Sequence, residues 1–249
     1  MAEVFLRVTN LHKSFRDFKA VDGVSFTIDK GEIFGLLGPN GAGKTTTIRM
    51  LSTVLPPDEG EITVGGYDMK TDAEAIRSLI GVCPQELALY EDLSAYDNMV
   101  FFGRMSGQTT PQAKEQAAAN LKLMGLQDRA RGKVSTFSGG MKRRINLAIA
   151  LMGSPQFLFL DEPTVGIDPQ SRNYIFENIR DLQNHGLTVL YTTHYMEEAD
   201  RLCNRVAVMD GGKIIAMDTP RNLKAQIGDP DRTTLEDVFL NLTGRSLRD

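Results

Sequence analysis

Residues 38–45 constrain the fold of this 249-residue chain more than any other stretch. They read Gly-Pro-Asn-Gly-Ala-Gly-Lys-Thr and satisfy every fixed position of the pattern G-x-x-x-x-G-K-[ST]. The apolar run 32–37 precedes them and the helix-like run 44–54 follows, so the loop joins a buried strand to a helix. Its glycines let successive backbone N–H groups turn inward, and the helix N-terminus adds positive partial charge. The loop is therefore suited to hold phosphate groups.

Within this loop, Lys44 can reach the outer phosphates of a nucleotide, and Thr45 can place its hydroxyl on Mg²⁺. A chance glycine-rich turn before a helix is the alternative, which the strand–loop–helix context argues against. The residues expected to contact the nucleotide are Gly38, Pro39, Asn40, Gly41, Ala42, Gly43, Lys44, Thr45 and Thr46.

A second apolar strand, residues 157–160, ends in the two carboxylates Asp161 and Glu162. Strands of an α/β sheet present their ligands at the carboxyl end. We therefore expect Asp161 to hold Mg²⁺, directly or through water, and Glu162 to act as a general base toward an attacking water. Taken alone, the pair would be a solvated acidic strand end; the phosphate loop makes the functional interpretation preferable.

Strands and helices alternate along most of the chain, which predicts a wound α/β core. Residues 86–152 differ, because they hold several helix starts and little strand pattern. Ser94 with Asp97 fits a capping box, and Thr110 fits an N-cap followed by proline. The expected strands are 3–8, 24–28, 32–37, 61–65, 157–160, 187–192, 205–209 and 213–217, and the other expected helices are 44–54, 168–184 and 195–202.

The last thirty residues contain a second capping-box pattern, Thr234 with Asp237. The side chains expected to share one apolar helix face and pack on the parent domain are Leu235, Val238, Phe239 and Leu242.

Composition narrows the class of protein. Hydrophobic residues make up 41% and charged residues 24%, with a net charge of −4, which indicates a globular chain and argues against nucleic acid as the main partner. No apolar run reaches 18 residues, so we expect no membrane span. The chain begins with an acidic segment that is not followed by the apolar segment of a signal peptide, so we expect no signal peptide. Cys83 and Cys203 lie in apolar stretches and are expected to be buried thiols in a reducing compartment.

Residues 138–142, Ser-Gly-Gly-Met-Lys, resemble the signature motif of the ATP-binding cassette family and lie roughly 20 residues before Asp161, as in that family. Ser138 would cap a helix whose N-terminus forms a second anion site with Gly139 and Gly140. The resemblance covers about residues 3–220. It implies ATP and Mg²⁺ as ligands, and a head-to-tail homodimer that encloses two ATP molecules.

Other residues resemble further motifs of the family. Gln85 is similar to the Q-loop glutamine, which touches Mg²⁺ and the attacking water. Asp168 is similar to the D-loop residue at the dimer interface, and His194 to the switch histidine that contacts the γ-phosphate. Phe15 resembles the aromatic that stacks on adenine, and Phe18 is an open alternative.

The fold that this resemblance implies is α/β, a P-loop NTPase core with an N-terminal antiparallel β subdomain and an inserted α-helical subdomain. The core with its β subdomain would take about residues 1–85 and 155–220. The helical signature subdomain would take about 86–152, and a C-terminal helical tail 221–249.

Residues 160–169, 192–200 and 235–244 resemble the branch of the family that pairs with ABC-2-type permeases. The implied function is ATP hydrolysis that drives transport, with export favoured, through a separate membrane permease. The chain would then be cytoplasmic, held at the inner face of the membrane by that permease. Residues that could line a docking groove, or alternatively form the subdomain's own core, are Leu87, Leu89, Tyr90, Phe101 and Phe102.

Two other classes of function remain as alternatives. A non-transport cassette ATPase acting on the ribosome or DNA usually carries two cassettes, long coiled coils or basic extensions, and the sequence contains none of these. A regulatory module without turnover would be favoured by changes at Lys44, Glu162 or His194, and all three residues are intact.

Overall fold

The structure, a computed structural model, describes residues 3–244 and divides into two compact units. The first takes in the described residues of Met1–Arg77 and Thr188–Asp249, and the second is Ser78–Leu187. The end of the predicted tail, residues 245–249, lies outside the described residues.

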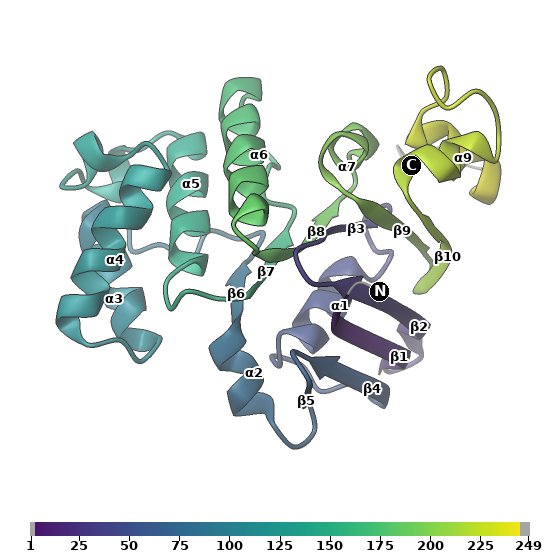
Figure 1. Cartoon of the computed structure of the whole chain (residues 1–249), viewed down its shortest axis with the longest axis horizontal. Coiled ribbons are helices and arrows are strands. Elements are labelled where there is room, and N and C mark those ends of the chain that lie inside the picture. The colour runs from purple at the N-terminus through teal and green to yellow at the C-terminus, as the bar shows by residue number, and fades with distance from the viewer. Residues whose placement is uncertain (1–2, 245–249) are drawn as a thin grey trace. The chain divides into compact units, whose positions relative to one another are not determined.

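An antiparallel sheet forms one layer of the first unit, as predicted for its N-terminal part (Figure 1). Its strand order is β2-β1-β4-β5, and every neighbouring pair is antiparallel. The predicted strands 3–8 and 24–28 are parts of two twelve-residue strands joined by a tight turn at Arg16 and Asp17. The strands are β1 (Val4–Phe15), β2 (Phe18–Asp29), β4 (Glu59–Val64) and β5 (Tyr67–Asp68).

A second group of strands in the first unit surrounds β3 (Ile33–Leu37). This strand runs parallel to β8 (Thr188–Thr193) and β9 (Arg205–Asp210), while β10 (Lys213–Asp218) is antiparallel to β9. Every residue of β3 and β8 is buried, as expected for parallel strands covered on both faces. The helices are α1 (Lys44–Leu51), α2 (Ala73–Leu79), α7 (Met196–Leu202), α8 (Pro220–Ala225) and α9 (Leu235–Thr243).

Helix α9 begins with the predicted capping box, in which Thr234 and Asp237 exchange hydrogen bonds. Leu235, Val238 and Phe239 are buried as expected. The prediction is wrong for Leu242, which is 44% exposed. This leucine lies in the last turn of the helix, one residue before its end, so the packed face ends before it.

The second unit combines a parallel strand pair with helices. Strand β6 (Ile80–Cys83) runs parallel to β7 (Phe157–Asp161). Helices α3, α4 and α5 pack against one another (Figure 1), which confirms the helix-rich middle of the chain. The helices are α3 (Ala95–Met105), α4 (Thr110–Leu123), α5 (Gly139–Ala150) and α6 (Pro169–Asn184), with short 3-10 turns at Gln127–Arg129 and Val134–Thr136.

Side-chain caps begin the helices of the second unit. Ser94 caps α3 as predicted, accepting a hydrogen bond from the Asp97 backbone N–H at 3.0 Å. The predicted cap at Thr110 is wrong, because the N-cap of α4 is Thr109. Gln112 lies three residues after Thr109, so the two can exchange the reciprocal bonds of a capping box, which Thr110 could not.

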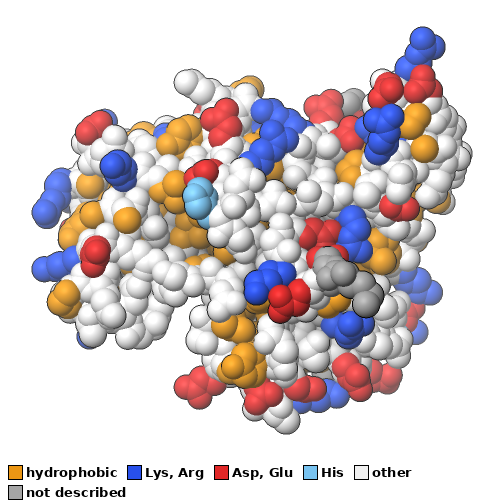
Figure 2. Space-filling model, in the orientation of Figure 1, with side chains coloured by type: hydrophobic (Ala, Val, Ile, Leu, Met, Phe, Trp, Pro, Cys, Tyr) orange, Lys and Arg blue, Asp and Glu red, His pale blue; other side chains and the backbone are white. Residues whose placement is uncertain are grey.

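The two cysteines are buried free thiols, as predicted. Burial raises the pKa of Cys83 to about 12 and also raises that of Cys203. On the face drawn in Figure 2, acidic and basic side chains are interspersed with hydrophobic ones. Every helix among residues 3–244 is too short or too polar to cross a lipid bilayer.

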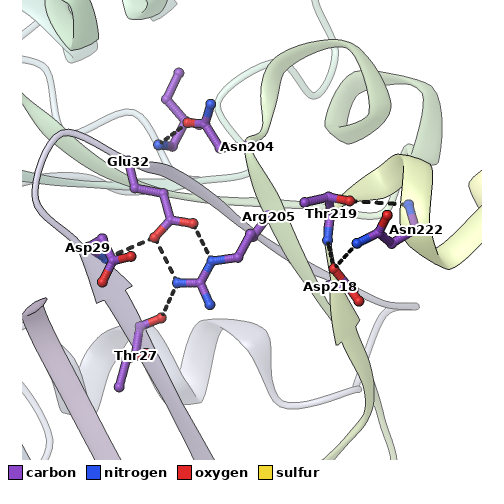
Figure 3. A network of polar contacts seen from close by, with 9 residues as sticks. Thr27, Asp29, Glu32, Asn204, Arg205, Asp218, Thr219 and Asn222 are labelled. Carbon is purple, nitrogen blue, oxygen red and sulfur yellow. Dashed lines mark hydrogen bonds and ion pairs between the residues drawn. The ribbon is translucent and has the colours of Figure 1, made fainter. Parts of the chain in front are cut away.

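A polar network anchors β9 beside β3 in the first unit (Figure 3). The Arg205 guanidinium donates to both carboxylate oxygens of Glu32, at 2.7 and 2.8 Å, and to the carbonyl of Thr27 at 2.9 Å. The Asn204 side chain accepts from the Ile33 N–H at 2.8 Å. Hydrogen bonding to Glu32 raises the pKa of Arg205 above its ordinary value. Two-pronged pairing of this kind fixes orientation as well as distance.

We predict that Glu32→Ala lowers the free energy of unfolding by about 2 kcal/mol, because the partly exposed Arg205 guanidinium loses its charge-assisted hydrogen bonds to the carboxylate. Denaturant titration followed by circular dichroism measures the change. A double variant, Glu32→Met with Arg205→Met, should lose less, since no charge is then left unpaired. If Glu32→Ala were as stable as the parent, the pair of Glu32 and Arg205 would contribute nothing to the free energy of unfolding, against this prediction.

Candidate functional site

The glycine loop of residues 38–45 lies between β3 and α1, as the sequence predicts. Gly43 is the N-cap of α1 and has a φ of 105°, and a Cβ there would collide with the carbonyl oxygen of Ala20. The Lys44 side chain is 5% exposed, and its ammonium donates to the carbonyls of Gly38 at 2.8 Å and Pro39 at 3.1 Å. The loop thus holds a buried positive charge directly at a helix N-terminus.

His194 belongs to the same sheet edge as this loop. Strands β3 and β8 are parallel, and Leu37 is paired with Thr193 at their last positions. Gly38 directly follows β3, and His194 directly follows β8. The glycine loop and the histidine therefore leave the sheet side by side. This adjacency supports the predicted contact of His194 with a phosphate held by the loop.

Gln85, Asp161 and Glu162 meet in the second unit by the same logic. Cys83 pairs with Leu160 in the parallel β6–β7 ladder, so Gln85 and Glu162 each lie two residues beyond that pair. The Gln85 Nε2 donates to the Glu162 Oε2 at 3.3 Å. Asp161 and Glu162 are each 4% exposed, so the solvated acidic strand end considered above is excluded.

The backbone at Glu162 is unusual, since its φ of 46° lies in the left-handed region that non-glycine residues rarely adopt. Strain of this kind persists where the surrounding structure fixes it, and it is concentrated at functional sites. The carboxylate carried by this strained backbone is the one that accepts the hydrogen bond of Gln85.

Arg143 is a residue that the sequence analysis overlooked. Its side chain lies on α5, is 6% exposed, and donates to the carbonyls of Gln85 at 2.8 Å and Pro84 at 3.2 Å. Asn146, one turn further along, donates to the Pro84 carbonyl at 3.1 Å. Helix α5 therefore holds the backbone of the segment that carries Gln85. A Lys-Arg-Arg run on a helix is typical of a solvated face, but its middle residue, Arg143, is buried.

The signature-like residues open α5 as expected. Ser138 accepts a hydrogen bond from the Met141 N–H at 3.2 Å, which confirms it as the N-cap. A Cβ at Gly140 would collide with the Ser171 side chain, so this glycine lets α5 approach the start of α6. Asp168 caps α6, and hydrogen bonds from Ser171 lower the pKa of Asp168. The signature and the predicted D-loop residue are therefore neighbours within the unit.

Phe15 and Phe18 face each other across the β1–β2 turn and are 48% and 61% exposed. Neither is a core residue, so both are available to a planar ligand. The Lys13 ammonium lies 6.0 Å from the ring centroid of Phe15. Both rings are therefore kept as candidates for the predicted aromatic contact.

Aromatic side chains gather at the start of the helical region. The Tyr90 ring contacts Phe101 edge-on at 5.0 Å and Phe102 at 6.0 Å. Leu87, Tyr90 and Phe101 are 39%, 50% and 39% exposed, while Leu89 and Phe102 are half-buried. The alternative that all five form the core of their own subdomain is therefore wrong for the first three.

The loop of residues 38–45, opening a helix at the end of a buried parallel strand, makes this chain a P-loop nucleotide-binding protein. The family described as "ABC transporter" matches residues 21–165. The chain belongs to this family.

Similar proteins agree with that assignment. The chain is 51% identical to "Linearmycin resistance ATP-binding protein LnrL" of Bacillus subtilis over 90% of its own length and 72% of the relative's. It is 46% identical to "Nod factor export ATP-binding protein I" of Sinorhizobium fredii, over 91% and 66%. Among solved structures, "Structure of ATP binding subunit of ABC transporter" is 27% identical, with a TM-score of 0.84, 96% of this chain and 99% of that chain covered. The chain is an ATP-hydrolysing subunit that energises transport through a separate membrane permease.

Proposed function

We propose that this chain drives the export of a substrate through an ABC-2-type permease. The observation that carries its catalytic part is the hydrogen bond from Gln85 to Glu162 beside the buried Asp161. Relatives named for linearmycin resistance, daunorubicin resistance and Nod factor export support the outward direction. The substrate itself would be selected by the permease, which carries the cargo contacts.

In the proposed reaction, a water attacks the γ-phosphorus of ATP while the bond to the β-phosphate oxygen breaks. Residues 38–46 hold the triphosphate through backbone N–H groups, and Lys44 offsets its charge. Glu162 takes the proton of the attacking water, and His194 contacts the γ-phosphate. Gln85 orients that water together with Glu162.

The proposed metal is Mg²⁺, because the predicted ligands Thr45, Asp161 and Gln85 each carry an oxygen atom, the donor that this ion prefers. The described residues hold no group of three or more His, Cys, Asp or Glu that could bind a metal alone. That fits an ion which takes its remaining ligands from phosphate and water. When bound, it neutralises charge on the β- and γ-phosphates.

The proposed working form is a head-to-tail homodimer. Residues 138–140 of one copy would cover the ATP held by residues 38–46 of the other, using the N-terminus of α5 as the second anion site. Asp168 would lie at the dimer interface, and Phe15 or Phe18 would stack on adenine. The Asp168 carboxylate, whose pKa is lowered by hydrogen bonds from Ser171, would bring a negative charge to a polar contact there.

The permease would dock on the exposed aromatic side chains near the start of α3, and so hold the chain at the cytoplasmic face of the membrane. Leu87, Tyr90 and Phe101 supply apolar area at the surface. Aromatic anchors of this kind dominate binding energy at protein interfaces. We retain residues 86–152 as the proposed helical subdomain that carries this surface.

Phe101→Glu tests the docking proposal. Co-expressed with a candidate ABC-2-type permease that the parent chain co-purifies with, the variant should lose at least about tenfold in co-purification, because a charge replaces an apolar anchor. Its ATP hydrolysis without the permease should stay within about twofold of the parent, since Phe101 lies outside the nucleotide-binding residues. Tyr67→Glu, at a similarly exposed aromatic of the other unit, is the matched control. Unchanged co-purification would refute the surface, and a parent chain that hydrolyses ATP yet binds no membrane protein would refute the transport role.

A further inference from the structure

A buried carboxylate lies directly behind His194. Glu198, on α7, is 3% exposed, and its Oε2 accepts hydrogen bonds from the Tyr191 hydroxyl at 2.8 Å and the Thr193 hydroxyl at 2.9 Å. Both donors lie on β8 and are at most 1% exposed. Burying an ionised carboxylate costs free energy unless hydrogen bonds stabilise its charge. The two hydroxyl donors on β8 provide such hydrogen bonds to Glu198.

The Thr193 hydroxyl continues this chain of bonds. It donates its proton to Glu198 and accepts a hydrogen bond from the Tyr195 backbone N–H at 2.9 Å. His194 is the residue between Thr193 and Tyr195. The buried carboxylate is therefore linked, through one hydroxyl, to the backbone on both sides of the histidine.

The histidine and the residue after it are partly open to solvent. His194 is half-buried and Tyr195 is 44% exposed. Tyr195 is the N-cap of α7, and its own backbone N–H donates to the Thr193 hydroxyl. The Tyr195 ring packs on the imidazole of His194, with 4.1 Å between the ring centroids.

We infer that Glu198, acting through the Thr193 hydroxyl, is a positioning residue that holds His194 in the orientation required to meet the γ-phosphate. The inference rests on the proposed role of His194 in hydrolysis. Tyr191 donates to the same oxygen from β8, and this bond ties α7 to β8.

Thr193→Val and Tyr191→Phe form a matched pair of tests. Each removes one hydrogen bond from the Glu198 Oε2 and keeps the shape of the side chain, but Thr193→Val alone breaks the bridge to Tyr195. Thr193→Val should lower kcat about 10- to 100-fold with KM for ATP within about twofold, since a misplaced group costs rate and not substrate binding. Tyr191→Phe should stay within about twofold in kcat, and Thr193→Ser, which keeps the hydroxyl, within about threefold.

Thermal denaturation of both variants separates positioning from stability. Thr193→Val loses the bond to Glu198 and the bond from the Tyr195 N–H, so it should be destabilised more than Tyr191→Phe, which loses one bond. The rates are therefore compared well below both denaturation midpoints, where each variant is folded. An unchanged kcat in Thr193→Val would overturn the inference. An equal fall in kcat for Tyr191→Phe would also overturn it, since Glu198 would then act only through stability.

His194→Ala separates this inference from the proposed function on which it rests. In the His194→Ala background, Thr193→Val should cause no further loss of kcat, because the group that it positions is gone. A further loss as large as in the parent would show that Thr193 acts elsewhere. If His194→Ala alone hydrolyses ATP at the parent rate, the proposed role of His194 fails; if it is inactive while Thr193→Val is fully active, only the positioning inference fails.

Discussion

Lys44→Met should lower ATP hydrolysis by about 10²- to 10³-fold, because one charge-assisted contact to phosphate in a site shielded from water is worth several kcal/mol. Lys44 is 5% exposed as a residue, and its ammonium donates hydrogen bonds to the loop carbonyls of Gly38 and Pro39. Methionine keeps the length of the side chain and removes the charge. Phosphate release measures the rate of hydrolysis, and a fluorescent ATP analogue measures the affinity for nucleotide. Both the rate and the affinity should fall.

Arg49→Met is the control for this prediction, because it removes a positive charge from the same helix at an exposed position. It should leave hydrolysis within about twofold of the parent, as surface substitutions usually do. The far-ultraviolet circular dichroism of both variants checks that α1 still forms. Hydrolysis by Lys44→Met at the parent rate would remove the basis for the nucleotide site.

Strong local patterns predicted most of the fold. Residues 157–160 and 187–192 are continuous apolar runs that form the buried strands β7 and β8 within one residue of the expected bounds. The helix expected at 168–184 is α6, since Asp168 supplies a cap and Pro169 the first helical residue. In each case one short segment carries its own start and stop signals.

Other elements carry no such signals. The β1–β2 hairpin turns at Arg16 and Asp17, and Arg16 adopts a φ of 56° without the Asn-Gly or Asp-Gly pair that marks such turns. Its strands also run well beyond the apolar core segments, into exposed residues such as Phe15 and Phe18. Strand β6 has four residues, too few for a periodic pattern, and the sequence left it unassigned.

The site shows the same division between local and long-range information. The motifs located the loop, the carboxylates and the capped signature helix, and the roles of these residues stay predictions. The pairing of Gln85 with Glu162 depends on the register of β6 against β7, which no local pattern encodes. Arg143 and Glu198 were missed because a charged side chain on a helix is usually solvated, and only the packing shows that these two are buried.

Glu162→Gln should lower ATP hydrolysis by about 10²- to 10⁴-fold, the contribution expected of a general base, while ATP still binds. Glutamine has nearly the same shape as glutamate but accepts no proton from water. Its amide oxygen can still receive the hydrogen bond that Gln85 now donates over 3.3 Å. The geometry of the site should therefore survive, and single-turnover phosphate release should show the loss in the chemical step.

The same variant should form a stable dimer when ATP is bound. Nucleotide that is bound and not hydrolysed keeps the phosphates between the loop of one copy and the α5 N-terminus of the other, so the population shifts to the dimer. Light scattering after size exclusion, with and without ATP and Mg²⁺, measures the shift. Glu177→Gln, an exposed carboxylate on α6, is the control and should behave as the parent.

Combining the two changes separates nucleotide grip from chemistry. Lys44→Met placed in the Glu162→Gln chain should abolish the ATP-dependent dimer, because the phosphates that join the copies are no longer held. If instead the double variant dimerised as well as Glu162→Gln, the association would arise from a surface unrelated to nucleotide. If Glu162→Gln hydrolysed ATP at the parent rate, the general base would have to be another group. The buried Glu162, with its strained backbone, would then serve only to orient Gln85.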